Sequence, residues 1–197
     1  MNTIPIFPLN VVLFPEGDLQ LRLFEPRYID MVRNCMRDDT GFGICLIKDG
    51  KEAGEAAEIF PLGTYSRIVD WEQMEDGLLG ITVVGERRFR VETSALQQDN
   101  LLTAEVTWLD DDDEPLPESY HGFTELLKEI INRYELPYDD DDERYDEATW
   151  VSERLAEILP FGLKTKQTLL EMDNALQRLD LMHVLLEKID AGDTNQS

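Results

Sequence analysis

The chain has 197 residues, 42% of them apolar, so it can bury a hydrophobic core and form one large domain or two small ones. Its formal net charge of −24 argues against binding to nucleic acids or anionic membranes, because both attract Lys and Arg. The apolar runs are too short to span a membrane, and the first residues lack the features of a signal peptide. The cytoplasm is therefore the expected location.

The first 28 residues consist of short apolar runs interrupted by prolines at positions 5, 8, 15 and 26. Each proline fixes φ and removes a backbone donor, so these runs predict brief strands joined by a turn. Pro26 has a different context, because the apolar residues after it recur at helical spacing as far as Met36. We therefore predict a helix over residues 26–37, with Pro26 in its first turn.

Short strands are predicted after this helix. The pattern indicates strands at 42–47, 59–71, 78–84, from 88 onward and at 101–109, an exposed loop at 48–58, and turns at 75–77 and 85–86. In the strand that begins at Arg88, alternation directs Phe89 and Val91 to the core and Arg88 and Arg90 to solvent. Several short strands with one early helix predict a compact barrel or a folded sheet.

An acidic segment at 110–117, with four aspartates and two prolines, predicts a solvated linker. Beyond it, apolar spacing predicts helices around 120–134, 151–158 and 164–172, and a fourth that is opened by Asn174 with Gln177 and continues to about Ile189. The expected organisation is a strand part at 1–109, the linker at 110–117, a helical part at 118–190 and a flexible tail at 191–197. The net charge is −8 over residues 1–109 and −16 over residues 110–197.

The cysteines and histidines give little support for redox or metal chemistry. Cys35 and Cys45 lack CxxC spacing, which favours reduced core thiols over a disulfide or a reactive thiol. His121 and His183 lie in helical patterns and are too few for a histidine-rich metal site.

The charged runs have ordinary interpretations. The aspartate-rich runs at 110–114 and 139–143 favour solvated loops over Ca²⁺ binding, because they lack the alternating ligands and central glycine of a calcium loop. The basic run at 85–90 favours internal ion pairing over an anion site, because carboxylates are abundant in this chain.

Catalysis is not predicted. The sequence has no GxxxxGK[ST] motif and no serine in a GxSxG context, so we expect no catalytic residue, no metal site and no cofactor. Most aromatic residues are expected in the core. Tyr65 and Trp71, near a strand end and a loop, are the candidates for an exposed peptide-contact surface.

Several motifs resemble the N-terminal domain of the ATP-dependent protease Lon, in the stand-alone form found in bacteria. They are IFPLN at 6–10 with Val12, FP at 14–15, FEPRY at 24–28, FG at 42–43, LGT at 62–64, GERRFRV at 85–91, KQ at 166–167, LLE at 169–171 and RL at 178–179. The resemblance covers residues 4 to about 189. It implies an α+β fold with a PUA-like β-barrel followed by a helical bundle, together forming one Lon N-terminal-type domain.

The resemblance also implies a role in recognising protein substrates, without the ATPase or the Ser-Lys protease of the full-length enzyme. The leading hypothesis is a non-catalytic, cytoplasmic module that binds unfolded or partner proteins in protein quality control or proteolysis. Two alternatives stay open: RNA binding, which PUA-like barrels perform elsewhere and which the charge opposes, and a small-ligand or enzyme site between barrel and helices.

Overall fold

The computed structural model describes residues 2–52, 57–110, 114–138 and 142–190. It divides into two compact units. The strand unit comprises residues 1–110 and 162–170, and the helical unit comprises residues 111–161 and 171–197. The predicted linker, the second acidic run and the tail lie partly or wholly outside the described residues.

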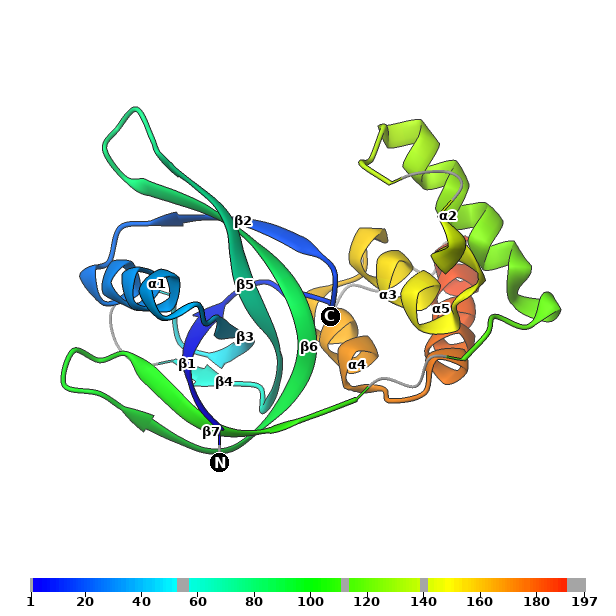
Figure 1. Cartoon of the computed structure of the whole chain (residues 1–197). Helices are drawn as coiled ribbons and strands as arrows, with labels where there is room; N and C mark the ends of the chain where they lie inside the picture. Colours follow the sequence, from blue (N-terminus) through cyan, green and yellow to red (C-terminus); the bar gives the residue numbers. More distant parts are fainter. Residues whose placement is uncertain (1, 53–56, 111–113, 139–141, 191–197) are drawn as a thin grey trace. The chain divides into compact units, whose positions relative to one another are not determined.

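Seven strands form one sheet in the strand unit (Figure 1). They are β1 (Asn2–Leu9), β2 (Asp18–Leu23), β3 (Phe42–Asp49), β4 (Glu58–Ile59), β5 (Leu62–Gln73), β6 (Leu79–Leu96) and β7 (Leu102–Trp108). The strand order is β1-β7-β6-β5-β3-β4, with β2 paired to β6. The path closes on itself because β1 pairs antiparallel with β7 and parallel with β3. The presence of both helices and strands confirms the predicted combination of α and β structure.

Helix α1 (Pro26–Asp38) confirms the predicted early helix, with Pro26 in its first turn. A proline is tolerated there because the first amides of a helix have no intrahelical acceptor. The helix ends at Asp39, which adopts left-handed backbone angles, with φ 52°. Tyr28, Met31 and Cys35 lie on its buried stripe.

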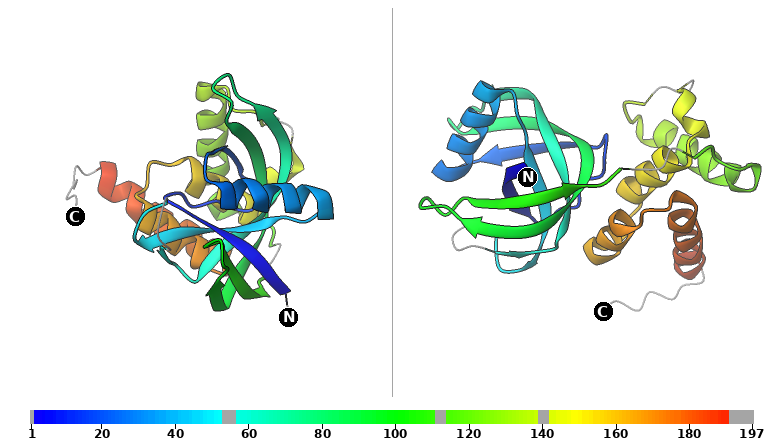
Figure 2. Two further views of the ribbon diagram at one scale, coloured as in Figure 1. Left: turned by 90° about the vertical axis from the view of Figure 1, so that its left-hand side faces the viewer. Right: turned by 60° about the horizontal axis from the view of Figure 1, so that its bottom comes forward.

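The core of the strand unit lies inside the curved sheet, and α1 packs against it (Figures 1 and 2). The ring of Phe7 stacks on that of Tyr28, with centroids 3.9 Å apart. The larger buried cluster consists of Phe7, Leu9, Leu13, Leu23, Tyr28, Met31, Val32, Cys35, Phe42, Ile44, Ile81, Val83 and Leu101. A smaller one consists of Ile4, Ile6, Cys45, Phe89, Ala104 and Val106. Both cysteines are thus buried free thiols, as predicted.

The predicted turn at 85–86 is wrong, because β6 runs without interruption through Gly85. The ladder with β5 shifts register at this point, so a bulge takes the place of the turn. The glycine serves a close backbone approach: a Cβ there would lie 2.4 Å from the carbonyl oxygen of Phe14. A glycine in a strand that marks a bulge or a close contact looks like a turn signal in the sequence.

The prediction that Arg88 faces solvent is also wrong. Its side chain is fully buried, and so is that of Phe89. Neighbouring side chains point to opposite faces of a strand, so both faces of β6 are covered here. Helix α4 (Leu163–Glu171) covers this face of β6, and Arg88 donates from Nη1 to the carbonyl oxygen of Leu170 at 2.9 Å. From the same helix, Gln167 donates to the carbonyl oxygen of Leu62 at 3.0 Å. A helix distant in sequence therefore turns the outer face of the strand into an interior.

The helical unit contains α2 (His121–Tyr134), α3 (Ala148–Ile158) and α5 (Ala175–Asp190), with short 3₁₀ turns at Glu118–Tyr120 and Glu143–Asp146. Asn174 caps α5 as predicted, since its Oδ1 accepts from the amide of Gln177 at 2.9 Å.

The interior of the helical unit is partly polar. Arg178 is fully buried and donates to Ser152 Oγ and to the carbonyl oxygen of Met172, both at 2.8 Å. Its Nη1 lies 3.5 Å from the buried carboxylate of Glu153. Fully buried Arg154 pairs with Glu157 at 3.1 Å. These charges are tolerated in the interior because each has an opposite charge or hydrogen-bond partner.

Candidate functional site

The strand unit extends into an arm, defined here as β2 together with residues 69–84 of β5 and β6. Beyond a register shift between Ile68 and Asp70, β5 and β6 continue as a hairpin, and β2 pairs with the other edge of β6. The hairpin projects from the rest of the sheet (Figure 1). Gly77, with φ 82°, closes its turn, and the Met74 amide donates to the carbonyl oxygen of Leu78 at 2.9 Å.

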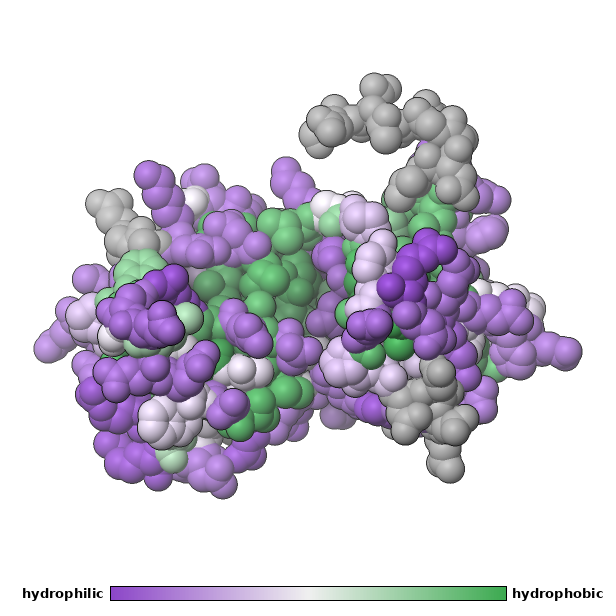
Figure 3. Space-filling view, turned by 90° about the horizontal axis from the view of Figure 1, so that it is seen from above, coloured by the Kyte–Doolittle hydropathy of each residue, from purple (hydrophilic) through white to green (hydrophobic). Residues whose placement is uncertain are grey.

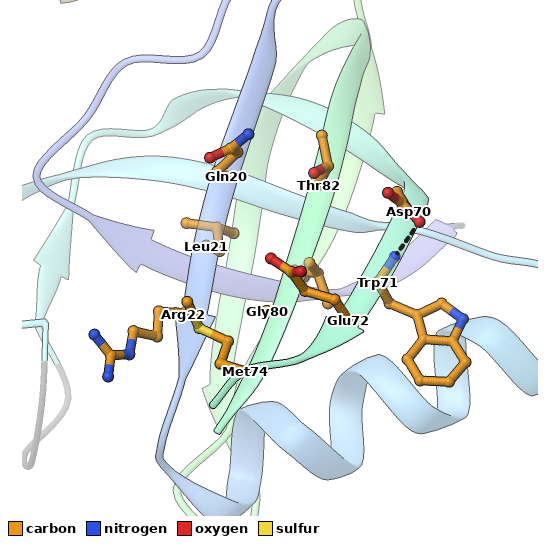
Figure 4. Close-up of a pocket in the computed structure, with 10 residues that line it drawn as sticks. Gln20, Leu21, Arg22, Asp70, Trp71, Glu72, Met74, Gly80 and Thr82 are labelled. Carbon is orange, nitrogen blue, oxygen red and sulfur yellow. Dashed lines mark hydrogen bonds between the residues drawn. The ribbon is translucent and has the colours of Figure 1, made fainter. Parts of the chain in front are cut away.

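The two faces of the arm differ. Trp71 pairs with Ile81, and Glu72 pairs with Gly80. Because side chains alternate along a strand, Trp71 lies on the face that carries buried Ile81, whereas Glu72 lies on the opposite face. Figure 4 shows this arrangement, with Trp71 directed away from Glu72 and Gln20.

The face with Glu72 contains a hollow of about 290 Å³ over Gly80. The absence of a side chain creates this space, since a Cβ on Gly80 would meet Glu72 Cγ at 3.2 Å and Met74 Cγ at 3.4 Å. Arg22 forms an ion pair with Asp76 near the hairpin turn. The hollow has a mixed polar and apolar lining, formed by Gln20, Leu21, Arg22, Asp70, Trp71, Glu72, Met74, Gly80, Ile81 and Thr82 (Figure 4).

The other side of β5 borders a groove of about 190 Å³ against the last turn of α1. Three large apolar side chains along it are exposed: Val69 by 60%, Trp71 by 58% and Met36 by 45%. We call these three residues the apolar patch. Figure 3, a view from above, shows apolar side chains exposed among the polar surface of the strand unit. The groove is lined by Cys35, Met36, Asp39, Thr40, Arg67, Ile68, Val69, Asp70 and Trp71.

The outer edge of β5 is open along the arm. In an antiparallel ladder, hydrogen-bonded pairs alternate with non-hydrogen-bonded pairs. The bond from Met74 to Leu78 makes that pair hydrogen-bonded, so Trp71 and Gln73 direct their amides and carbonyls away from β6. The Trp71 amide donates to Asp70 Oδ1 at 2.8 Å (Figure 4). Among the described residues, β3 pairs with β5 only over Thr64–Ser66, before the arm begins.

The charges around the groove are predominantly negative. Arg67 donates to Asp39 at 2.8 Å and lies 3.5 Å from Glu86. The hydrogen bond to Asp39 is the main cause that raises the pKa of the Arg67 guanidinium. Residues 68–86 contain five acidic side chains and no Lys or Arg. Within the described parts of the chain, no ion pair engages Asp70 or Glu72.

The two residues predicted for a peptide-contact surface occupy different surroundings. Trp71 belongs to the apolar patch. Tyr65 is half-buried, packs edge-to-face on Trp108 at 5.2 Å, and accepts a hydrogen bond from the Gly41 amide at 2.5 Å. Val69 and Met36 were not among the contact residues predicted from the sequence. The adjacent apolar pair at positions 68 and 69, which breaks strand alternation, was an available signal for Val69.

A separate hollow of about 160 Å³, with a mostly apolar lining, lies along β2. Phe24, exposed by 60%, borders it together with the stacked pair of Phe7 and Tyr28. Its lining includes Leu9, Leu21 and Leu23, so it is smaller than the hollow over Gly80 but more apolar.

The remaining predicted features provide no site in the described ranges. Within these ranges no group of three or more His, Cys, Asp or Glu side chains could hold a metal ion, and no helix is long and apolar enough to cross a membrane. Burial raises the pKa of the Cys35 and Cys45 thiols. In the basic run, Arg87 lies over the Trp108 ring at 3.8 Å.

Comparison with known proteins relates the chain to one family. Residues 3–188 match the family described as the ATP-dependent protease La (LON) substrate-binding domain. The Lon protease of Cytophaga hutchinsonii is 26% identical over 95% of this chain, which spans 24% of the length of that protease.

Two solved structures share the fold. The Lon N-terminal domain protein from Xanthomonas campestris is 34% identical, has a TM-score of 0.79, and is matched over 93% of this chain and 98% of its own. The N-terminal domain of the Mycobacterium avium complex Lon protease is 16% identical, with a TM-score of 0.66 and coverage of 91% and 95%. The chain therefore belongs to the Lon substrate-binding domain family.

Proposed function

We propose that this chain is a protein-binding module that recognises unfolded or extended segments of other proteins, with the arm as its contact surface. The family match over residues 3–188 carries the proposal, because the family is described by its binding of protease substrates. The apolar patch supports it, since exposed apolar side chains beside an open strand edge suit polypeptide binding.

The proposal does not extend to proteolysis or ATP hydrolysis, which are activities of relatives about four times as long as this chain. The sequence favours a non-catalytic role in the cytoplasm, in protein quality control, and the proposal includes this role. The proposal includes a PUA-like barrel as the fold of the strand unit, and the closed path of strands supports this interpretation. Tyr65 remains a proposed contact residue together with Trp71.

Binding to a permanently unfolded protein tests the proposal. We expect reduced and carboxamidomethylated ribonuclease A, labelled with fluorescein, to bind in an anisotropy titration, and native ribonuclease A not to bind. Trp71→Ala should weaken binding at least fivefold, because it removes the largest side chain of the apolar patch. Tyr134→Ala is the matched control, since Tyr134 is an aromatic residue exposed by 67% in the helical unit. Equal binding of the unfolded and native probes, or no binding of either, would contradict the proposal.

A further inference from the structure

We propose that the open edge of β5 binds an extended segment that alternates apolar and basic side chains and joins the sheet as an additional strand. The proposal rests on the proposed function and specifies which segments the arm selects. Three properties of the arm carry it: the direction of its free backbone groups, the apolar patch on one face, and the carboxylates on the other.

The backbone of β5 offers the first property. Trp71 and Gln73 direct their amides and carbonyls outward, which is the arrangement that an incoming strand pairs with. The Trp71 amide is bonded to Asp70 Oδ1, so this amide has an acceptor when the edge is empty. An incoming carbonyl oxygen would replace this carboxylate as the acceptor and would leave Asp70 available for a basic side chain.

The groove against α1 offers the second property. A residue placed opposite Trp71 in an antiparallel pair has its side chain on the same face as the indole. That face borders the groove that contains Val69 and Met36. An aliphatic side chain at this position would cover apolar surface that is now exposed to water.

The carboxylates offer the third property. The next residue of the incoming strand lies opposite Glu72, on the face with the hollow over Gly80, where Asp70 also lies. Arg22 on this face is already paired with Asp76. A lysine or arginine at this position therefore meets negative charge, and opposite charges across a pair are favourable.

The same carboxylates exclude other occupants. A second copy of this chain pairing through its own β5 edge would bring Asp70 and Glu72 of both copies close together, and like charges across a pair are destabilising. An acidic segment is disfavoured for the same reason. The edge is thus protected against self-association while it accepts a basic strand.

Backbone-methylated peptides provide the test. The probe is a fluorescein-labelled nonapeptide that alternates valine and lysine, titrated with the whole chain at low salt. If the peptide adds antiparallel, N-methylation of the valine amides should weaken binding at least tenfold, and N-methylation of the lysine amides should have little effect. The reverse pattern would also support strand addition, in parallel orientation. Equal binding of the two methylated peptides would overturn the proposal.

Charge variants test the basic side of the segment. Glu72→Gln combined with Asp70→Asn should weaken binding of the valine–lysine peptide about fivefold or more, and the effect should shrink at high salt. The asparagine retains an oxygen that can accept from the Trp71 amide, so the edge itself is preserved. Glu125→Gln, an exposed change in α2, is the matched control. A peptide with glutamate in place of lysine should not bind, and binding as tight as that of the lysine peptide would contradict the proposal.

Tryptophan fluorescence locates the bound peptide. Trp71 is exposed by 58%, whereas Trp108 is only partly exposed and Trp150 is exposed by 4%, so acrylamide quenching reports mainly on Trp71. The peptide should reduce this quenching, and it should have little effect in a Trp71→Phe variant. Unfolded ribonuclease A is titrated in parallel. If it binds while both methylated peptides bind alike, strand addition fails and the proposed function stands; if it does not bind, the proposed function itself fails.

Discussion

The strand unit completely buries Arg88, and the helical unit completely buries Arg154 and Arg178. The described partners of Arg88 and Arg178 differ. Arg88 in β6 donates to the backbone carbonyl of Leu170, 82 residues further along the chain. Arg178 in α5 bonds to Ser152 and lies beside the buried carboxylate of Glu153. A backbone carbonyl is present whatever the side chain is, whereas a hydroxyl and a carboxylate depend on residue identity. A substitution at Ser152 or Glu153 therefore removes a described partner of Arg178, whereas a substitution at Leu170 leaves its carbonyl available to Arg88.

The largest effect is expected from Arg178→Met. It leaves Glu153 as a buried carboxylate without its arginine, and breaking a buried pair in this way costs about 3–5 kcal/mol. Urea unfolding followed by the fluorescence of Trp150, with Trp71 and Trp108 replaced by phenylalanine, measures the stability of the helical unit. Arg133→Met, which removes an exposed ion pair with Glu129, should change stability by less than about 0.5 kcal/mol.

A second substitution sharpens this prediction. Adding Glu153→Gln to Arg178→Met removes the buried carboxylate that has lost its contact with Arg178, and it should restore part of the stability. If the single change costs less than about 1 kcal/mol, the helical unit does not depend on this network, and the contrast between the two interiors is lost.

Arg88→Met should have a smaller effect, about 1.5–3 kcal/mol, because the buried carbonyl of Leu170 loses the charged donor that is bonded to it. Hydrogen exchange of the α4 amides is the appropriate measurement, since the bond ties that helix to β6. Arg90→Met, an exposed change on the same strand, is the control. An unchanged exchange rate in α4 would show that Gln167 and apolar packing hold the helix without Arg88.

Two glycine substitutions, one in each unit, test how closely the backbone is packed. Gly85→Ala should destabilise the strand unit by about 1–3 kcal/mol, because the new Cβ would lie 2.4 Å from a backbone oxygen of Phe14. Gly122→Ala should stabilise the helical unit by up to about 1 kcal/mol, because the position is helical and has nothing within 4 Å. Chemical denaturation measures both, and equal effects would contradict the close approach at Gly85.

The smallest expected effect is a loss of folding stability at low pH. A hydrogen bond from Arg144 lowers the pKa of Asp142 to about 2. Because the folded pKa lies below the ordinary aspartate value of 3.8, the stabilisation is present above that value and is lost as pH falls toward 2. Arg144 is 40% exposed, so screening keeps the contribution below about 1 kcal/mol. Thermal unfolding from pH 5 to pH 2 should show less acid sensitivity for Asp142→Asn than for Asp110→Asn.

Local signals predicted many of the elements. Pro26 and the apolar residues at three- and four-residue spacing predicted α1, and Asn174 with Gln177 predicted the start of α5. These predictions are confirmed because a helix cap and an amphipathic stripe depend on residues a few positions apart. Gly85 gave rise to a wrong turn prediction. In the sequence, a glycine needed for a close backbone approach looks the same as a glycine needed for a turn.

The candidate surface was only partly predictable. Trp71 was proposed from its place near a loop, but the sequence does not show that Met36 borders the same groove. Long-range packing brings these residues together, and the open edge of β5 depends on which strands pair with it. Membership of the Lon substrate-binding family, by contrast, was apparent from motifs spread over most of the chain and is confirmed by the family match.

The sequence by itself determined the family, most helix and strand positions and the acidic character of the arm, because these depend on residue type and short-range spacing. Only the tertiary structure decided that Arg88 is buried, that β6 is continuous, and that Trp71, Val69 and Met36 share one groove. The physical reason is that the burial of a strand face depends on what packs against it. For β6 that partner is a helix more than seventy residues later in the chain.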